Sequence, residues 1–284
     1  MNICINDQPA DITLDTEKTL GDVLSGIEYW ISSTGSRIRE ISVDGQVLAD
    51  DALCGAFDRD VKDIKKLDIA VSAYRELAAE ALGILRQTCL LYSEAAFDDR
   101  PQIAEAWEIS AASYFLRADI SDLYTLAGRA FSGEGLSVHD LSIIVEERQR
   151  EIVNPGLEIA GCEALVKNIA ERMEELPLDI QTGKDQKAAE TIQLFSRTAE
   201  KLFRVFFVFE SEGLSLDNFL VDSLPGRTFM EEFTAALTEI SAAYENRDTV
   251  LVGDLSEYEL SPRLLKFFFA LKDFSGPPPI VTSP

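Results

Sequence analysis

The chain has 284 residues, of which 46% are apolar and 27% are charged, and its formal net charge is −24. This length is sufficient for two domains, and this composition is typical of globular proteins. Because acidic residues are spread along the whole chain, nucleic acids and anionic membrane surfaces are predicted to be poor partners.

The sequence contains no stretch of about 18 apolar residues, so no membrane-spanning helix is predicted. The N-terminus lacks the basic and apolar segments of a signal peptide. The cysteines are widely separated and form no C-x-x-C pair, which is typical of buried thiols in a reducing compartment: Cys4, Cys54, Cys89 and Cys162. We therefore expect a cytoplasmic protein.

Residues 1–73 are predicted to form a small α+β domain. Five short segments have the β-branched or alternating pattern of strands: Met1–Ile5, Ala10–Leu14, Arg39–Val43, Gln46–Leu48 and Leu67–Val71. Asn6-Asp7-Gln8-Pro9 predicts a turn between the first two strands, and Asp44-Gly45 predicts the turn of a second hairpin.

One helix is predicted between the two hairpins, capped by Asp15 or Thr16 and ended by Gly35. Its apolar side chains recur at helical spacing and are expected to be buried: Leu20, Val23, Leu24, Ile27, Trp30 and Ile31.

This order of hairpin, helix, hairpin and final strand resembles ubiquitin-like β-grasp domains, as does the turn Val43-Asp44-Gly45. The resemblance implies a binding or docking module, although a fold does not fix a function. The conjugating and sulfur-carrier branches of that superfamily need a free C-terminal Gly-Gly. Here the last strand continues through Ser72-Ala73-Tyr74 into a helical region, so conjugation and sulfur transfer are not expected.

Residues 74–276 are predicted to form an all-α bundle of about six to eight helices joined by short polar links. The bundle is either one body or subdivided near residue 177, and a flexible tail is expected over 277–284. The first helices are expected over residues 72–97 with Ser72 as cap, 102–131 with a bend at 119–121, 137–152 with Ser137 as cap, and 157–176 before Pro177.

The longest helix is predicted over Thr182–Glu212, with Thr182 and Asp185 as a capping box. Its apolar residues form one stripe at steps of three and four: Ala188, Ile192, Phe195, Ala199, Leu202, Phe206 and Phe209. Three further helices are expected: a short one after Ser215, one over Phe229–Tyr244, and one over Thr249–Phe274 that Pro262 breaks or kinks.

The segments IQTGKDQKAAETIQLF and AAYENRDTVLVGDLSEYELSPRLLKFF, within residues 178–274, look like the helical half of uncharacterised bacterial proteins. Those proteins pair a G-K-D-x-x-A helix with a D-L-x-E-Y-E-L-x-P helix. The resemblance implies a bacterial helical bundle and carries over no activity.

Two polar motifs are weak candidates for chemistry. His139 is the only histidine and lies at a helix start, so neither a histidine-rich metal site nor a catalytic triad is predicted. The stretch Thr182-Gly183-Lys184-Asp185 lacks the frame of a phosphate-binding loop, and we interpret it as a helix N-terminus. No catalytic, cofactor-binding or metal-ligating residue is therefore assigned.

Most carboxylates are expected on solvated faces. Asp254, Glu257, Tyr258 and Glu259 differ because they lie in an otherwise apolar helix beside a proline. Our hypothesis is that they form an interface or a polar cluster inside the bundle and pair there with Arg204. A bound cation at this cluster is an open alternative.

The stretches FRVFFVF and LLKFFFAL are expected to supply the core of the bundle, and any part left exposed is expected to be an interface, such as the seam of a homodimer.

The sequence favours a non-enzymatic bacterial protein that binds other proteins as an adaptor or scaffold, without a cofactor. The first alternative is an acidic chaperone-like protein for an assembly or export substrate. The second, a carboxylate- and metal-dependent enzyme, has no metal frame or nucleophile–base pair in its favour.

Overall fold

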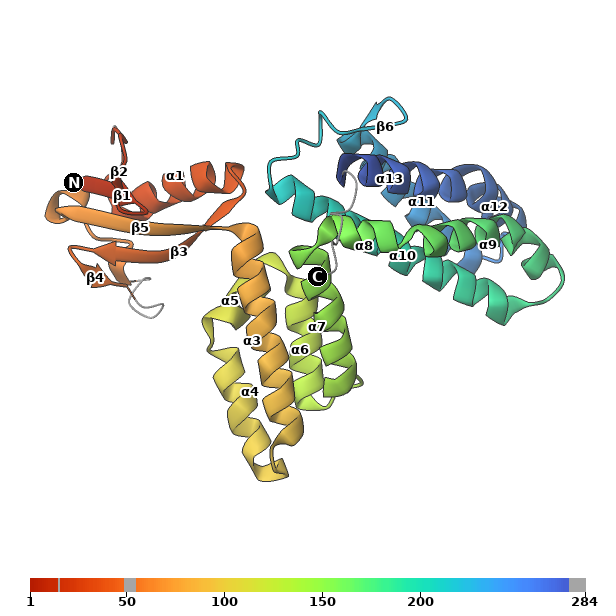
Figure 1. The fold of residues 1–284 in the computed structure, drawn as a ribbon, viewed down its shortest axis with the longest axis horizontal. Coiled ribbons are helices and arrows are strands. Elements are labelled where there is room, and N and C mark those ends of the chain that lie inside the picture. Colours follow the sequence, from red (N-terminus) through yellow and green to blue (C-terminus); the bar gives the residue numbers. More distant parts are fainter. Residues whose placement is uncertain (15, 49–54, 276–284) are drawn as a thin grey trace, which may run out of the picture. The chain divides into compact units, whose positions relative to one another are not determined.

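A computed structural model describes residues 1–14, 16–48 and 55–275 of the chain. A mixed sheet and its helix come first, and the remainder is mostly helical, as predicted at this level (Figure 1). The chain folds into two compact units, Met1–Gln149 with Ser211–Gly213 and Arg150–Glu210 with the described residues from Leu214 on. Each unit is considered by itself below.

The first unit begins with a five-stranded sheet of order β2-β1-β5-β3-β4. The strands are β1 (Asn2–Ile5), β2 (Gln8–Pro9), β3 (Ser36–Val43), β4 (Gln46–Val47) and β5 (Lys66–Ala73). β1 and β5 are parallel, and the other neighbours are antiparallel. The predicted Asp44-Gly45 turn is confirmed, because both residues have the positive φ angles (51° and 84°) of a tight hairpin turn.

The second strand is shorter and earlier than predicted. Gln8 and Pro9 pair with β1, Ala10 donates one further hydrogen bond to Ile3, and Ile12 and Leu14 pack against the core without a strand partner. The chain therefore leaves the ladder opposite Ile3, before the start of β1 at Asn2, and the apolar side chains of residues 10–14 turn to the core instead.

Helix α1 (Leu20–Ser33) packs on one face of the sheet, and Figure 1 shows it running beside β1, β5 and β3. Its cap is Thr19, whose hydroxyl accepts from the Asp22 amide while Asp22 accepts from the Thr19 amide. This capping box replaces the predicted cap at Thr16, and Asp15 lies outside the described residues. The stripe is buried except for Trp30, whose side chain is 56% exposed, so its predicted burial is wrong.

The rest of the first unit is helical: α3 (Tyr74–Glu94), α4 (Arg100–Glu108), α5 (Ala111–Asp119), α6 (Ser121–Ser132) and most of α7 (Val138–Val153), with short 3₁₀ turns at Val61–Asp63 and Phe97–Asp99. The residues of α7 from Arg150 on belong to the second unit. Ser72 does not cap α3, because it lies in β5 opposite Arg37. The single helix expected over 102–131 is three helices, and Ser110 caps the second by accepting from the Ser113 amide at 3.1 Å. Ser137 caps α7 as predicted.

The second unit contains α8 (Pro155–Gly161), α9 (Glu163–Gln181), α10 (Asp185–Ser211), α11 (Gly226–Glu245), α12 (Thr249–Asp254) and α13 (Ser261–Ser275). A two-strand hairpin, β6 (Leu220–Val221) and β7 (Leu224–Pro225), takes the place of the short helix expected after Ser215. Its turn residues Asp222 and Ser223 both have positive φ angles.

Two helix ends in this unit differ from the predictions, and a third prediction, at Pro262, is met in another form. Pro177 lies inside α9, and the facing Gly253 leaves room for its ring, since a Cβ on Gly253 would lie 3.3 Å from it. Thr182 caps the C-terminus of α9, where its hydroxyl donates to the Leu178 carbonyl at 2.8 Å. The break or kink predicted near Pro262 takes the form of a π-helical segment, Leu255–Leu260, between α12 and α13.

Phenylalanines form the centre of the second unit. The centroid of the Phe267 ring lies 5.3 Å from that of the Phe203 ring and 5.7 Å from that of the Phe229 ring. Phe267 also packs near several further rings. Phe206, Phe209, Phe267 and Phe268 are buried, which confirms that the aromatic stretches supply core. Phe207 and Phe269 remain partly exposed. No described helix is long and apolar enough to cross a membrane.

Candidate functional site

A groove of about 520 Å³ lies in the N-terminal domain between the segment that follows β2 and helix α1. Its apolar surface comes from Ile5, Ala10, Ile12, Leu14, Val23, Ile27 and Trp30. This volume is within the range of roughly 300–1,000 Å³ that is usual for ligand sites. The extended path of residues 10–14, which leaves the sheet after Ala10, forms one wall.

The charged side chains that line the groove are all acidic in the part of the chain that the structure describes: Asp11, Glu17 and Asp22. Asp22 is held by hydrogen bonds from the amides of Lys18 and Thr19, both 3.0 Å long. These hydrogen bonds lower the pKa of the Asp22 carboxyl below its ordinary value. The carboxylate therefore stays ionised at neutral pH, and the groove presents negative charge beside an apolar surface.

Gly26 lies in the middle of α1 and lines the groove. A Cβ on Gly26 would have no atom within 4 Å beyond the backbone of its own helix, so packing does not require glycine here. Glycine inside a helix costs about 0.5–1 kcal/mol relative to alanine. At this position the missing side chain keeps the groove open along the helix backbone.

Two aromatic side chains are exposed at the end of α1. Trp30 lines the groove, and the adjacent Tyr29 is 84% exposed. Exposed tryptophan and tyrosine side chains are enriched where proteins bind partners. The spacing of Trp30 fits the apolar stripe of α1, which is why periodicity alone predicts its burial.

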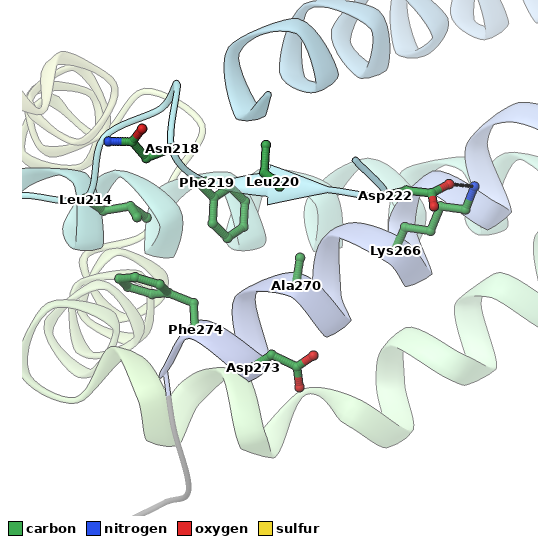
Figure 2. A pocket seen from close by; sticks show the side chains of 9 residues that line it. All are labelled: Leu214, Asn218, Phe219, Leu220, Asp222, Lys266, Ala270, Asp273 and Phe274. Atoms are coloured by element: carbon green, nitrogen blue, oxygen red, sulfur yellow. Dashed lines mark hydrogen bonds and ion pairs between the residues drawn. The ribbon is translucent and has the colours of Figure 1, made fainter. Parts of the chain in front are cut away.

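A second hollow of about 660 Å³ lies in the other unit, beneath the β6–β7 hairpin and beside α13 (Figure 2). Phe219, Phe274 and Leu214 supply apolar surface, and Asp222 pairs with Lys266 at 2.6 Å. The only described lysine or arginine that lines this hollow is thus paired within it, beside a second acid, Asp273, whereas the charges that line the N-terminal groove share one sign. The N-terminal groove is therefore the stronger candidate for a binding site.

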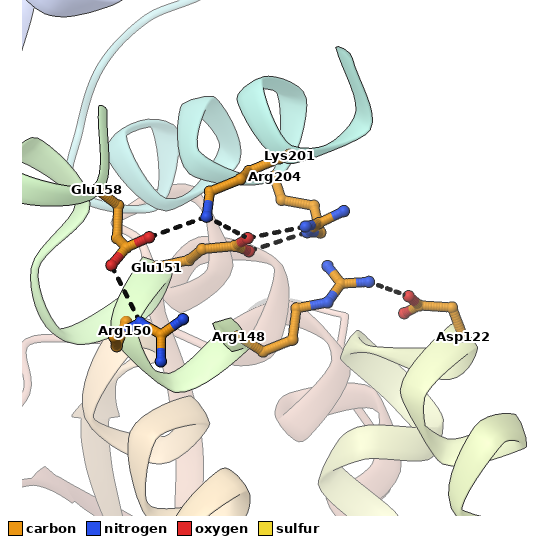
Figure 3. Close-up of polar contacts among 7 residues, drawn as sticks. All are labelled: Asp122, Arg148, Arg150, Glu151, Glu158, Lys201 and Arg204. Carbon is orange, nitrogen blue, oxygen red and sulfur yellow. Dashed lines mark hydrogen bonds and ion pairs between the residues drawn. The ribbon is translucent and has the colours of Figure 1, made fainter. Parts of the chain in front are cut away.

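Arg204 occupies an ion-pair network in the second unit (Figure 3). Its guanidinium donates to both carboxylate oxygens of Glu151, at 2.9 Å and 2.8 Å, and only 2% of the Glu151 side chain is exposed. Lys201 lies 3.8 Å from Glu151 and 2.9 Å from Glu158, which also pairs with Arg150. Within the second unit, the network joins Arg150 and Glu151 at the end of α7 to α8 and α10, and so it stabilises the fold of this unit.

The acidic cluster predicted to accompany Arg204 has other contacts. Asp254, Glu257 and Tyr258 are exposed, so they do not form a buried polar cluster. Tyr258 hydrogen-bonds to Glu257, which raises the pKa of its hydroxyl, and Glu259 pairs with Arg263. Within the described ranges, no group of three or more His, Cys, Asp or Glu side chains is placed to hold a metal ion.

The two weak polar motifs are also placed. His139 is exposed in the first turn of α7, as predicted. Lys184 pairs with the buried carboxylate of Asp179 at 3.1 Å, and Lys187 pairs with it at 2.8 Å. The exposed lysine of the Thr182–Asp185 stretch is thus engaged in an ion pair that stabilises the α9–α10 connection.

Comparisons with known families match two parts of the chain. Residues 1–73 match the family model described as TP0873 N-terminal domain, and residues 159–268 match the model described as Domain of unknown function (DUF8042). The first match coincides with the predicted N-terminal domain, and the second lies in the helical remainder. No curated protein and no solved structure matches the chain.

Proposed function

We propose that this chain is a non-enzymatic adaptor or scaffold that binds a segment of another protein in the groove of its N-terminal domain. The observation that carries this proposal is Gly26, a helix-interior glycine with no packing partner that lines an apolar groove. A glycine in such a place allows a ligand to approach the helix backbone closely.

We further infer that residues 1–73 are a β-grasp domain of the ubiquitin-like type. The strand order β2-β1-β5-β3-β4, the parallel central pair and the single helix on one face support this assignment. Domains of this shape serve widely as docking modules, so the inferred fold is compatible with an adaptor but does not prove it.

The groove contains acidic and apolar side chains but no histidine or cysteine among its described lining residues. A binding role uses these side chains directly, since apolar surface supplies affinity and charge supplies selectivity. The chaperone-like alternative predicts capture of unfolded chains in general. The adaptor predicts a defined partner.

The test is a capture experiment with the full chain immobilised and an extract of the source organism. Three forms are compared: the wild type, Gly26→Ala and Gly26→Trp. The methyl group of alanine leaves the groove open, whereas the indole of tryptophan fills it. The Cβ of either variant meets no neighbouring atom, and Gly26 is exposed, so we expect both variants to fold.

We expect one or a few proteins to be captured at a fixed ratio by the wild type and by Gly26→Ala and to be lost with Gly26→Trp. Identical capture by all three forms would contradict the proposed function. Circular dichroism and the melting temperature of each form show whether a loss of capture reflects the groove or the fold.

A further inference from the structure

We propose that the partner segment is cationic and apolar, with a Leu-like or aromatic side chain flanked by Lys or Arg. This inference rests on the proposed function and names the chemistry of the ligand in the same groove. It commits to a segment of another protein as the occupant.

The first argument is charge. Asp11, Glu17 and Asp22 line one hollow, and no described basic side chain lines it with them. The Glu17 carboxylate is oriented by the Thr16 amide at 3.0 Å, and that of Asp22 by the amides of the capping box. Both carboxylates are therefore already fixed in place, so binding a cation there costs little further conformational entropy.

The second argument is the apolar surface between these acids. Ile12 and Leu14 are half-buried in one wall, and Val23 and Ile27 of α1, which are 2% and 4% exposed, lie at the floor. An aliphatic or aromatic side chain that enters the groove would contact these apolar side chains. Trp30 lies at the same groove with half of its side chain exposed. A Lys or Arg side chain can pack its methylene stem against such a ring and place its charge over the ring face.

The same charges disfavour the other occupants. A nucleic acid or an anionic lipid surface would bring phosphates against three carboxylates. A second copy of this chain carries a formal charge of −24, so two copies repel each other overall. A basic segment of a different protein is the complementary ligand.

The probes are three short synthetic peptides with the same central Leu pair, flanked by Lys, by Gln or by Glu and labelled for fluorescence anisotropy. With the full chain, we expect the Lys-flanked peptide to bind about tenfold more tightly than the Gln-flanked one at low salt, and the Glu-flanked one most weakly. Raising the ionic strength from about 0.1 M to about 1 M shortens the Debye length from about 10 Å to about 3 Å and should remove this preference.

The matched variants are Asp11→Lys in the groove and Asp98→Lys in the 3₁₀ turn Phe97–Asp99, which change the net charge equally. We expect Asp11→Lys to lower the affinity for the Lys-flanked peptide about tenfold and to leave the affinity for the Gln-flanked peptide unchanged. Asp98→Lys should change the affinity of neither peptide by more than about twofold, because Asp98 is exposed and does not line the groove.

Equal affinities for the three peptides, or equal effects of Asp11→Lys and Asp98→Lys, would overturn this inference. If Gly26→Trp still abolishes peptide binding in that case, the groove remains a binding site without charge selection. If Gly26→Trp changes neither peptide binding nor capture of a cellular partner, the proposed function and this inference both fall. The inference would also be overturned if the chain bound vesicles rich in anionic lipid as tightly as it binds the Lys-flanked peptide.

Discussion

Gly26 and Trp30 lie one helical turn apart on the same face of α1, and both line the groove of the N-terminal domain. One has no side chain and the other has a large aromatic side chain that is half exposed. Neither feature stabilises an isolated helix or a core, since the glycine lowers helix stability and the tryptophan leaves apolar surface in water. Their presence on one face of α1 is explained if this face binds a ligand.

Gly26→Ala should stabilise the protein. The helix interior gains about 0.5–1 kcal/mol when alanine replaces glycine, and the new methyl group meets no neighbouring atom. Urea unfolding measures the change. The matched control is Gly45→Ala, which should lower stability because Gly45 has a φ angle of 84°. Destabilisation by Gly26→Ala would mean that the glycine has a packing role in the folded protein.

Arg204→Ala should destabilise the second unit by about 3 kcal/mol, because it removes two hydrogen bonds from a carboxylate that remains buried. The control is Arg227→Ala, which removes an exposed pair with Asp217 and should cost less than about 1 kcal/mol. The difference between the two urea midpoints is the readout. Equal midpoints would show that the Glu151 pair contributes no more than a surface contact.

Phe267→Ala and Phe269→Ala test the aromatic core with two residues of one helix. Phe267 is fully buried among other rings, so its loss should cost about 3–5 kcal/mol. Phe269 is 40% exposed, so its replacement by alanine should lower the free energy of unfolding by about half as much or less. Thermal unfolding of both variants gives the comparison, and a reversed order would contradict the assigned core.

Glu163 should give the second unit an acid-sensitive contribution to stability. Hydrogen bonds from Lys167 and Lys272 lower the pKa of its carboxyl from 4.5 to about 2. A depressed carboxyl pKa contributes stability that is complete above the ordinary pKa and is lost as the pH falls toward the folded-state value. Glu163→Gln should therefore be less stable than the wild type at neutral pH, and the difference should shrink between about pH 4.5 and about pH 2. A difference that stays constant over this range would show that the effect is not protonation of Glu163.

Local patterns predicted much of the fold, because local physics determines those parts. The alternation in β1 and β5, the Asp44-Gly45 turn, the Ser137 cap and the break before Pro262 all depend on a few adjacent residues. Where two local signals competed, the prediction failed. Apolar periodicity runs on through Ser110, but its side chain caps α5 and the helix restarts there.

The other differences come from one long-range contact and from two local signals that are easily misread. Arg204 forms a partly buried ion pair, but its partner Glu151 is 53 positions away and no spacing rule connects the two. The β6–β7 hairpin uses Asp222 and Ser223 in left-handed conformations that glycine or asparagine usually signals. The groove was missed because Trp30 fits the helical stripe, although Gly26 in the helix interior was a visible signal.

The most direct measurement of the central claim uses Trp30 as its own reporter. The chain has two tryptophans, and Trp107 is buried, so Trp107→Phe leaves Trp30 as the only indole. Titration of this variant with the Lys-flanked Leu peptide should shift the Trp30 emission to shorter wavelength, because the bound peptide shields the ring from water. The shift should be absent with the Glu-flanked peptide. An unchanged emission at concentrations where anisotropy shows the peptide bound would place binding elsewhere and contradict the account.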